Sequence, residues 1–267
     1  LFRSPETSKC GRLFSRTPPP LHTDLFMPRR TTENVPIRWA RAAGVLYLII
    51  IVFGIFTEVA VRQSVLVPGD AAATATKLLA SEPLFRLGFL TDSIVFLSDA
   101  ALAVLLYLLF RPVSRTLALV AAAFRLTQTA VLALNLLGHH AALLLLDTPA
   151  YAAAFDGAQL RALSYLALDL HGHGYDLGLL FFGVHCLVLG YLIVRSTYVP
   201  KLLGGLVVAA GLTYLVGTYT RFLLPEHLGT VAPIYGIAFV GELSLCLWLL
   251  VKGVRLEEWR KITTPGP

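Results

Sequence analysis

The amino-acid sequence predicts an all-α, polytopic integral membrane protein with six transmembrane helices and both termini in the cytoplasm. Hydrophobic residues make up 56% of the 267 residues, charged residues only 14%, and the mean hydropathy is +0.72. Six apolar stretches are long enough for a spanning helix, which needs about 20 predominantly apolar residues. Lys and Arg residues are also distributed unevenly between the segments that connect these stretches.

Residues 1–36 contain Pro and Arg but no apolar run, so we expect a disordered basic N-terminal tail. The only methionine is Met27, and we expect the native chain to start there, with residues 1–26 as upstream translation or a disordered tail. Initiation at a codon other than that of Met is the alternative. A cleaved signal peptide is disfavoured, because the first apolar run is longer than a signal-peptide core.

We expect a six-helix membrane domain over residues 37–254 and a cytoplasmic C-terminal tail over residues 255–267, with Trp259 as an interfacial anchor. None of the apolar stretches alternates as a strand would. Asp70 follows a Pro-Gly turn and predicts the cap of a short helix on the outer surface. The expected spans are 40–61, 84–110, 116–137, 170–194, 200–224 and 231–251.

The basic residues report the orientation of the chain. With the N-terminus inside, 16 of the 22 Lys and Arg residues fall on the cytoplasmic side and Arg125 falls within the membrane. The outer set is Arg62, Lys77, Arg86, Arg161 and Arg221. Because this asymmetry explains the net charge of +6, we expect a lipid bilayer as partner and no nucleic acid.

Ionisable residues within the spans fall into two layers, and such residues are costly in hydrocarbon and face the bundle interior. In the midplane layer, Asp99 lies 13 residues before Pro112 and Arg125 lies 13 residues after it. These two side chains therefore sit at similar depth on adjacent antiparallel helices, and we expect them to form an ion pair. The midplane set is Asp99, Arg125, Gln128, His185 and Glu242.

The second layer lies toward the outer surface and is richer in acids and histidines. We expect an outer polar mouth formed by Glu58, Asp92, Asn135, His139 and Asp176. Asp169, His173 and Asp176 are spaced i, i+4, i+7, so one helix face presents two carboxylates and an imidazole, which could bind a divalent metal. Helix capping or interfacial hydrogen bonding is the alternative role for this set of residues.

Known catalytic signatures are missing from the sequence. It contains no phosphate-binding Walker loop, nucleophile elbow, dinucleotide fingerprint or HExxH helix. Cys10, Cys186 and Cys246 give no disulfide framework. No cofactor follows from the residues.

Several stretches resemble the bacterial multi-pass membrane family known as domain of unknown function 4386. They are RAAGVLYLIIIVFGIFTEVAVR, VPGDAAATATKLLASEPLFRLGFLTD, LLYLLFRPVSRTLALVAAAFRLTQ, FFGVHCLVLGYLIVRSTYVPKLLGGLVVAAGLTYL and GELSLCLWLLVKG. The resemblance covers about Arg41 to Gly253. It implies a six-helix protein of the bacterial plasma membrane and carries no established activity.

Three functions remain open from the sequence. The polar interior could bind or move a small ligand, ion or proton, with the outer mouth gathering it and the midplane layer holding it. The buried charges could instead only specify helix packing in a structural, assembly or stress-related component. The third hypothesis is a metal-dependent membrane-embedded enzyme that uses Asp169, His173 and Asp176.

Overall fold

The computed structural model describes residues 35–263, and every regular element in this range is a helix. Six helical segments are long and apolar enough to cross a bilayer, which confirms the predicted all-α membrane fold with six spanning helices. These segments are Val35–Val65, Glu82–Phe110, Arg115–Asp147, Gly157–Arg195, Lys201–Leu223 and Pro225–Val251. The chain is therefore a multi-pass membrane protein. Met27, Cys10 and most of the expected N-terminal tail lie outside the described residues.

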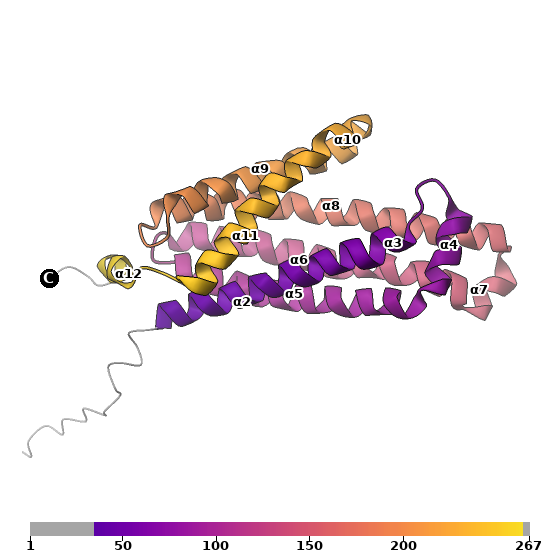
Figure 1. Cartoon of the computed structure of the whole chain (residues 1–267), viewed down its shortest axis with the longest axis horizontal. Coiled ribbons are helices and arrows are strands. Elements are labelled where there is room, and N and C mark those ends of the chain that lie inside the picture. Colours follow the sequence, from indigo (N-terminus) through magenta and orange to yellow (C-terminus); the bar gives the residue numbers. More distant parts are fainter. Residues whose placement is uncertain (1–34, 264–267) are drawn as a thin grey trace, which may run out of the picture. The chain divides into compact units, whose positions relative to one another are not determined.

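The first and last spanning segments are each built from several helices (Figure 1). The first comprises α2 (Val35–Ile55), the π-helix η1 (Phe56–Arg62) and α3 (Gln63–Val65). The last comprises η2 (Pro225–His227), α10 (Leu228–Val231), η3 (Ala232–Ile234) and α11 (Tyr235–Val251). The remaining helices are α4 (Ala71–Ala80), α5 (Glu82–Phe110), α6 (Arg115–Asp147), α7 (Pro149–Ala154), α8 (Gly157–Arg195), α9 (Lys201–Leu223) and α12 (Leu256–Thr263).

Side-chain caps fix where three of these helices begin. The Asp70 carboxylate accepts a hydrogen bond from the Ala73 amide, as expected for the cap of the short helix α4. Ser114 caps α6 by accepting from the Leu117 amide. Asp156 and Gln159 form a capping box at the start of α8. These polar caps supply partners for amides that have none within the first turn of a helix.

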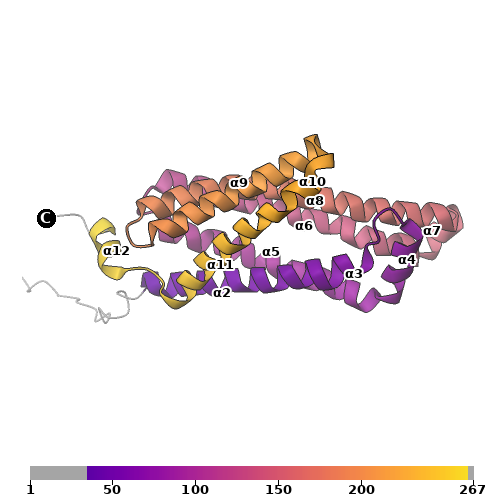
Figure 2. The same cartoon turned by 45° about the horizontal axis from the view of Figure 1, so that its top comes forward.

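The six spanning segments pack as a closed ring. The neighbouring pairs are α2 with α5, α5 with α6, α6 with α8, α8 with α9, α9 with α11, and α11 with α2. Figure 2 shows the long helices α6 and α8 extending past the end of α9 toward α4 and α7. Because the ring closes, polar residues that face inward from different helices can meet in one interior.

Helices α8 and α9 approach so closely that their backbones touch. A Cβ atom added to Gly190 would lie 2.6 Å from the Gly204 carbonyl oxygen, and one added to Gly211 would lie 2.7 Å from that of Gly183. Small residues at a helix interface allow two backbones to approach this closely. Gly205 differs, because no atom lies within 4 Å of the position of its Cβ.

Helices α6 and α8 are longer than the expected spans 116–137 and 170–194. With 39 residues, α8 is about 58 Å long, whereas the hydrocarbon core is about 30 Å thick. A tilt of up to about 40°, the upper end seen in membrane helices, does not absorb this difference. The ring is held together at the α12 end, where the Tyr198 hydroxyl donates to the Leu109 carbonyl at 2.6 Å. The surplus turns of α6 and α8 therefore extend at the opposite end, beside α4 and α7 (Figure 1).

The expected C-terminal tail contains the helix α12, which docks onto the bundle. The Trp259 ring is 8% exposed and packs edge-on against the Tyr198 ring at 5.1 Å. The Arg255 amide donates to the Tyr198 carbonyl oxygen at 3.2 Å. Trp259 thus packs against protein. Burial also raises the pKa of the Tyr198 hydroxyl, which keeps this donor protonated.

Candidate functional site

The predicted ion pair between Asp99 and Arg125 is present. Arg125 is fully buried on α6, and its Nε and Nη2 atoms donate to Asp99 Oδ1 on α5 at 2.9 and 2.5 Å. The other carboxylate oxygen, Oδ2, accepts a hydrogen bond from the Thr129 hydroxyl at 2.5 Å. Both oxygens of this buried carboxylate are therefore paired, as a charge in a low-dielectric interior requires.

His185 on α8 completes this network and is neutral in it. Its Nδ1 atom lies 2.8 Å from the Ala121 carbonyl oxygen, and its Nε2 atom lies 3.1 Å from Arg125 Nη1. A carbonyl oxygen only accepts and a guanidinium only donates, so the imidazole proton must be on Nδ1 and Nε2 must be the acceptor. We call Asp99, Arg125, Thr129 and His185 the midplane lock.

Aromatic rings cover the remaining faces of the Arg125 guanidinium. Its Cζ atom lies 5.2 Å from the centroid of the Tyr47 ring and 5.1 Å from that of Phe182. Such cation–π contacts further stabilise a charge removed from water. Gln128, one turn along α6, is 7% exposed, and its Oε1 atom has no hydrogen-bond partner within residues 35–263.

Glu242 on α11 belongs to the same predicted layer but not to the midplane lock. Its carboxylate accepts hydrogen bonds from the Tyr47 hydroxyl on Oε2, at 3.1 Å, and from the Tyr214 hydroxyl on Oε1. Across the described part of the chain, no cation lies within ion-pair distance of Glu242. The midplane acids therefore differ: one is paired with a cation, and the other has only hydroxyl donors.

Two arginines organise the outer layer. Arg62 on η1 bridges two carboxylates, with Nε 2.8 Å from Glu58 and Nη1 2.7 Å from Asp92. Arg221 on α9 pairs with Asp176 on α8. From the sequence, these two arginines indicated only the orientation of the chain, and neither was expected at the outer polar mouth. The i, i+4 spacing of Glu58 and Arg62 is the signal that could have found the first pair.

The segment that carries Glu58 and Arg62 is a π-helix. Its end is marked by the Gln63 amide, which donates to the Glu58 carbonyl five residues earlier. Within it, the Thr57 hydroxyl lies 2.7 Å from the Thr91 hydroxyl of α5. Single π turns are rare and occur frequently at functional sites, because they alter which side chains face the interior.

An open cavity of about 850 Å³ lies at this end of the ring. It forms where α9 ends at Leu223 while α8 continues alongside. Charged groups and apolar side chains share its wall, and Asp169, Gly172 and Tyr175 come from α8. The other lining residues are Glu58, Arg62, Gln63, Val65, Leu66, Phe85, Leu168, His171, Asp176, Leu179, Tyr214, Gly217, Arg221, Leu228, Gly229, Val231, Ala232 and Tyr235. We call this space the outer cavity.

Two neighbouring buried histidines, His139 and His171, each have one ring nitrogen without a partner among the described residues. His171 donates from Nδ1 to the Asn135 carbonyl at 2.9 Å, and His139 donates from Nε2 to the Phe85 carbonyl at 3.1 Å. Their other nitrogens, His171 Nε2 and His139 Nδ1, are acceptors without a partner among the described residues. The two rings lie 5.6 Å apart. Of the two, His171 lines the cavity.

Asp169, His173 and Asp176 do not form the metal site that the sequence suggested. His173 Nδ1 donates to the Asp169 backbone carbonyl at 2.9 Å, and the Asp176 carboxylate pairs with Arg221. Within residues 35–263, no group of three His, Cys, Asp or Glu residues is arranged to hold a metal ion. The helical spacing was right, but a cation from α9 neutralises one of the three expected ligands.

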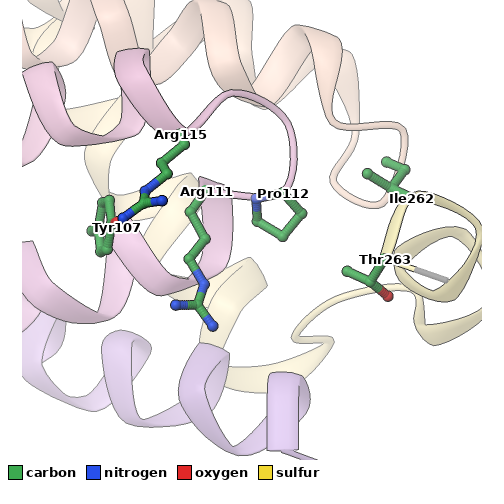
Figure 3. Close-up of a pocket in the computed structure, with 6 residues that line it drawn as sticks. All are labelled: Tyr107, Arg111, Pro112, Arg115, Ile262 and Thr263. Atoms are coloured by element: carbon green, nitrogen blue, oxygen red, sulfur yellow. The ribbon is translucent and has the colours of Figure 1, made fainter. Parts of the chain in front are cut away.

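A second cavity, of about 460 Å³, lies at the α12 end and contains none of the predicted site residues. Its wall comes from the turn between α5 and α6, with Tyr107, Arg111, Pro112 and Arg115, and from Ile262 and Thr263 of α12. Figure 3 shows Ile262 and Thr263 across the cavity from the two arginines. It is separate from the polar groups described above.

The chain has recognisable relatives. The model of a family described as "Domain of unknown function (DUF4386)" matches residues 42–253. An "Uncharacterized protein" of the archaeon Archaeoglobus fulgidus is 31% identical over 172 residues, which cover 64% of this chain and 86% of that protein. No solved structure matches.

Proposed function

This chain belongs to the family described as "Domain of unknown function (DUF4386)", and we propose that it is a membrane protein that binds a small amphiphilic molecule in the outer cavity. The observation that carries this proposal is the cavity itself. Its volume of about 850 Å³ falls in the range of small-molecule sites, which combine an apolar wall with a few convergent polar groups.

The lining favours a ligand whose head group donates hydrogen bonds or carries positive charge. The carboxylates of Glu58, Asp169 and Asp176 line the cavity together with Arg62 and Arg221, so carboxylates outnumber guanidiniums on this wall. The unpaired His171 Nε2 atom is an acceptor for a ligand N–H or O–H. The aromatic rings that line the cavity are suited to contact an ammonium group of the ligand. Leu66 and Val231 supply apolar surface for the apolar tail of the ligand.

A cavity-filling substitution tests this proposal. Gly172 lines the cavity and has no atom within 4 Å of its Cβ position, so Gly172→Leu can add a side chain at the cavity wall without a clash at Cβ. Gly205→Leu is the matched control, because Gly205 is also unobstructed but does not line the cavity. Leu is also a better helix former than Gly at both positions.

The measurement is native mass spectrometry of the full chain purified in mild detergent. We expect a bound small molecule in the wild type and in Gly205→Leu, and its loss in Gly172→Leu. A wild-type protein without a bound molecule, or one that Gly172→Leu retains in full, would overturn the proposal.

We further propose that both termini face the cytoplasm of a bacterial plasma membrane, which places the outer cavity outside. The unequal distribution of Lys and Arg supports this orientation. Ala152→Cys on α7 should then react with a membrane-impermeant maleimide in intact cells, whereas Lys261→Cys on α12 should react only after permeabilisation. Both residues are exposed, and the native Cys186 and Cys246 are buried. The reverse labelling pattern would refute the orientation.

The alternative role, in which buried charges only specify helix packing, is supported by the midplane lock. Each of the four residues of the midplane lock has hydrogen-bond partners within it, and none of the four lines either cavity. We therefore assign to the midplane lock a role in fixing the arrangement of α5, α6 and α8, and to the outer cavity the role in binding.

A further inference from the structure

Glu242 is the midplane acid whose partners do not neutralise it. Asp99 is balanced by Arg125, and the hydrogen bonds of His185 require a neutral ring. If Glu242 were ionised, the midplane layer would carry one uncompensated negative charge. Charges at such depth are costly and are normally paired with an opposite charge, so protonation of Glu242 is the way for this layer to reach zero net charge.

The groups around Glu242 come from all the surrounding helices, and only one of them is cationic. That cation is Arg125, which is already engaged by Asp99. The titratable groups that act on Glu242 or respond to it are Tyr47 on α2, Asp99 on α5, Arg125 on α6, Tyr175 and Cys186 on α8, Tyr214 on α9 and Cys246 on α11.

Tyr214 connects Glu242 to the outer cavity. Tyr214 donates to Glu242 Oε1, and the same residue lines the cavity together with Tyr235, whose ring lies 6.0 Å from that of Tyr214. A phenol both donates and accepts hydrogen bonds. On the other side, Tyr47 is 1% exposed, and its ring is covered by the Arg125 guanidinium, so that side is closed.

We propose that Glu242 is a proton-binding site that exchanges its proton with water in the outer cavity through the Tyr214 hydroxyl. In the uptake step, a hydronium ion in the cavity gives a proton to the Tyr214 oxygen while the original Tyr214 proton passes to Glu242 Oε1. Hydronium becomes water, the carboxylate becomes a neutral carboxylic acid, and Tyr214 is unchanged. Release is the reverse. This inference goes beyond ligand binding and uses the cavity only as a route for water.

Infrared difference spectroscopy of the full chain in lipid nanodiscs tests the site directly. At neutral pH, we expect a carboxylic-acid C=O stretching band that disappears in Glu242→Gln. Glu58→Gln is the control and should leave this band unchanged, because the Glu58 side chain is 51% exposed at the outer rim. Loss of the band in Asp99→Asn with retention in Glu242→Gln would overturn the assignment, as would the absence of any such band.

The route is tested by exchange into heavy water. Tyr214→Phe keeps the aromatic ring and removes only the relay hydroxyl, so the Glu242 band should persist, shift because one hydrogen bond is lost, and take up deuterium more slowly. Tyr47→Phe should shift the band without slowing exchange. Equal exchange rates in the wild type and Tyr214→Phe would overturn the route. If Glu242→Gln does not fold, the shift of the band in Tyr214→Phe still identifies it as the band of Glu242. A band whose frequency is the same in the wild type and in Tyr214→Phe would overturn the assignment. None of these measurements requires a bound ligand, so the proposed function can fail while this inference stands.

Discussion

Arg125 and Arg62 show what different burial does to the same side chain in one bundle. The Arg125 side chain is 0% exposed and meets one carboxylate, one imidazole and two aromatic faces. The Arg62 side chain is 15% exposed, bridges two carboxylates and lines the outer cavity. In the first region every donor has a partner inside the protein. In the second, acids and unpaired acceptors remain available to a ligand. The first region is therefore suited to fixing helix packing and the second to binding.

The largest effect on stability is expected from a substitution in the midplane lock. Arg125→Ala leaves Asp99 buried without its cation and should lower the free energy of unfolding by about 3–5 kcal/mol, measured by reversible denaturation in mixed micelles. The double variant Asp99→Leu/Arg125→Leu removes both charges and should be clearly more stable than Arg125→Ala. A double variant as unstable as the single variant would show that the bundle depends on the ion pair itself.

A smaller effect is expected from a neutral member of the same region. Thr129→Val keeps the shape of the side chain but removes the hydroxyl that donates to Asp99 Oδ2. Hydrogen bonds to charged groups contribute about 1.5–3 kcal/mol, and the same unfolding measurement should report a loss of this size. Thr127→Val is the control on the neighbouring exposed face, where the hydroxyl bonds only to its own helix. Equal losses in both variants would mean that Asp99 gains nothing from Thr129.

The smallest effects on stability are expected from the ion pairs of Arg62, and they should differ between its two carboxylate partners. The Asp92 side chain is 4% exposed, whereas that of Glu58 is 51% exposed. Exposed ion pairs contribute about 0–1 kcal/mol, so Glu58→Gln should leave the melting temperature almost unchanged, and Asp92→Asn should lower it more. The opposite order would place the stabilising contact of Arg62 at the rim.

The fold could be predicted from the sequence because each span carries its own hydropathy signal. The Asp99–Arg125 pair could be predicted too, because a tight hairpin at Pro112 forces residues at equal distances from the turn to equal depth. Depth does not determine rotation about the helix axis. For this reason the sequence placed Glu242 in the layer of Asp99 but could not reveal that its partners are Tyr47 and Tyr214.

The outer cavity illustrates the other limit of sequence reasoning. Glu58 and Asp176 were expected at a polar mouth, and both line the cavity. Arg62 was not assigned to it, although its i, i+4 spacing from Glu58 indicates their pair. The contact of Arg62 with Asp92 on α5 and that of Arg221 with Asp176 on α8 depend on how the ring closes. The cavity is lined by residues from several spanning segments, and hydropathy alone does not reveal how these segments meet.

The length of α8 has a practical consequence. A helix of 39 residues cannot be contained in the bilayer, so the α6–α8 hairpin and the short helices α4 and α7 form a folded projection on one side of the membrane. With the orientation proposed above, an antibody fragment raised against α7 and its neighbours should bind this projection in intact cells. Such a fragment would add a recognisable feature for electron cryo-microscopy, because most of the described residues lie in the spanning helices.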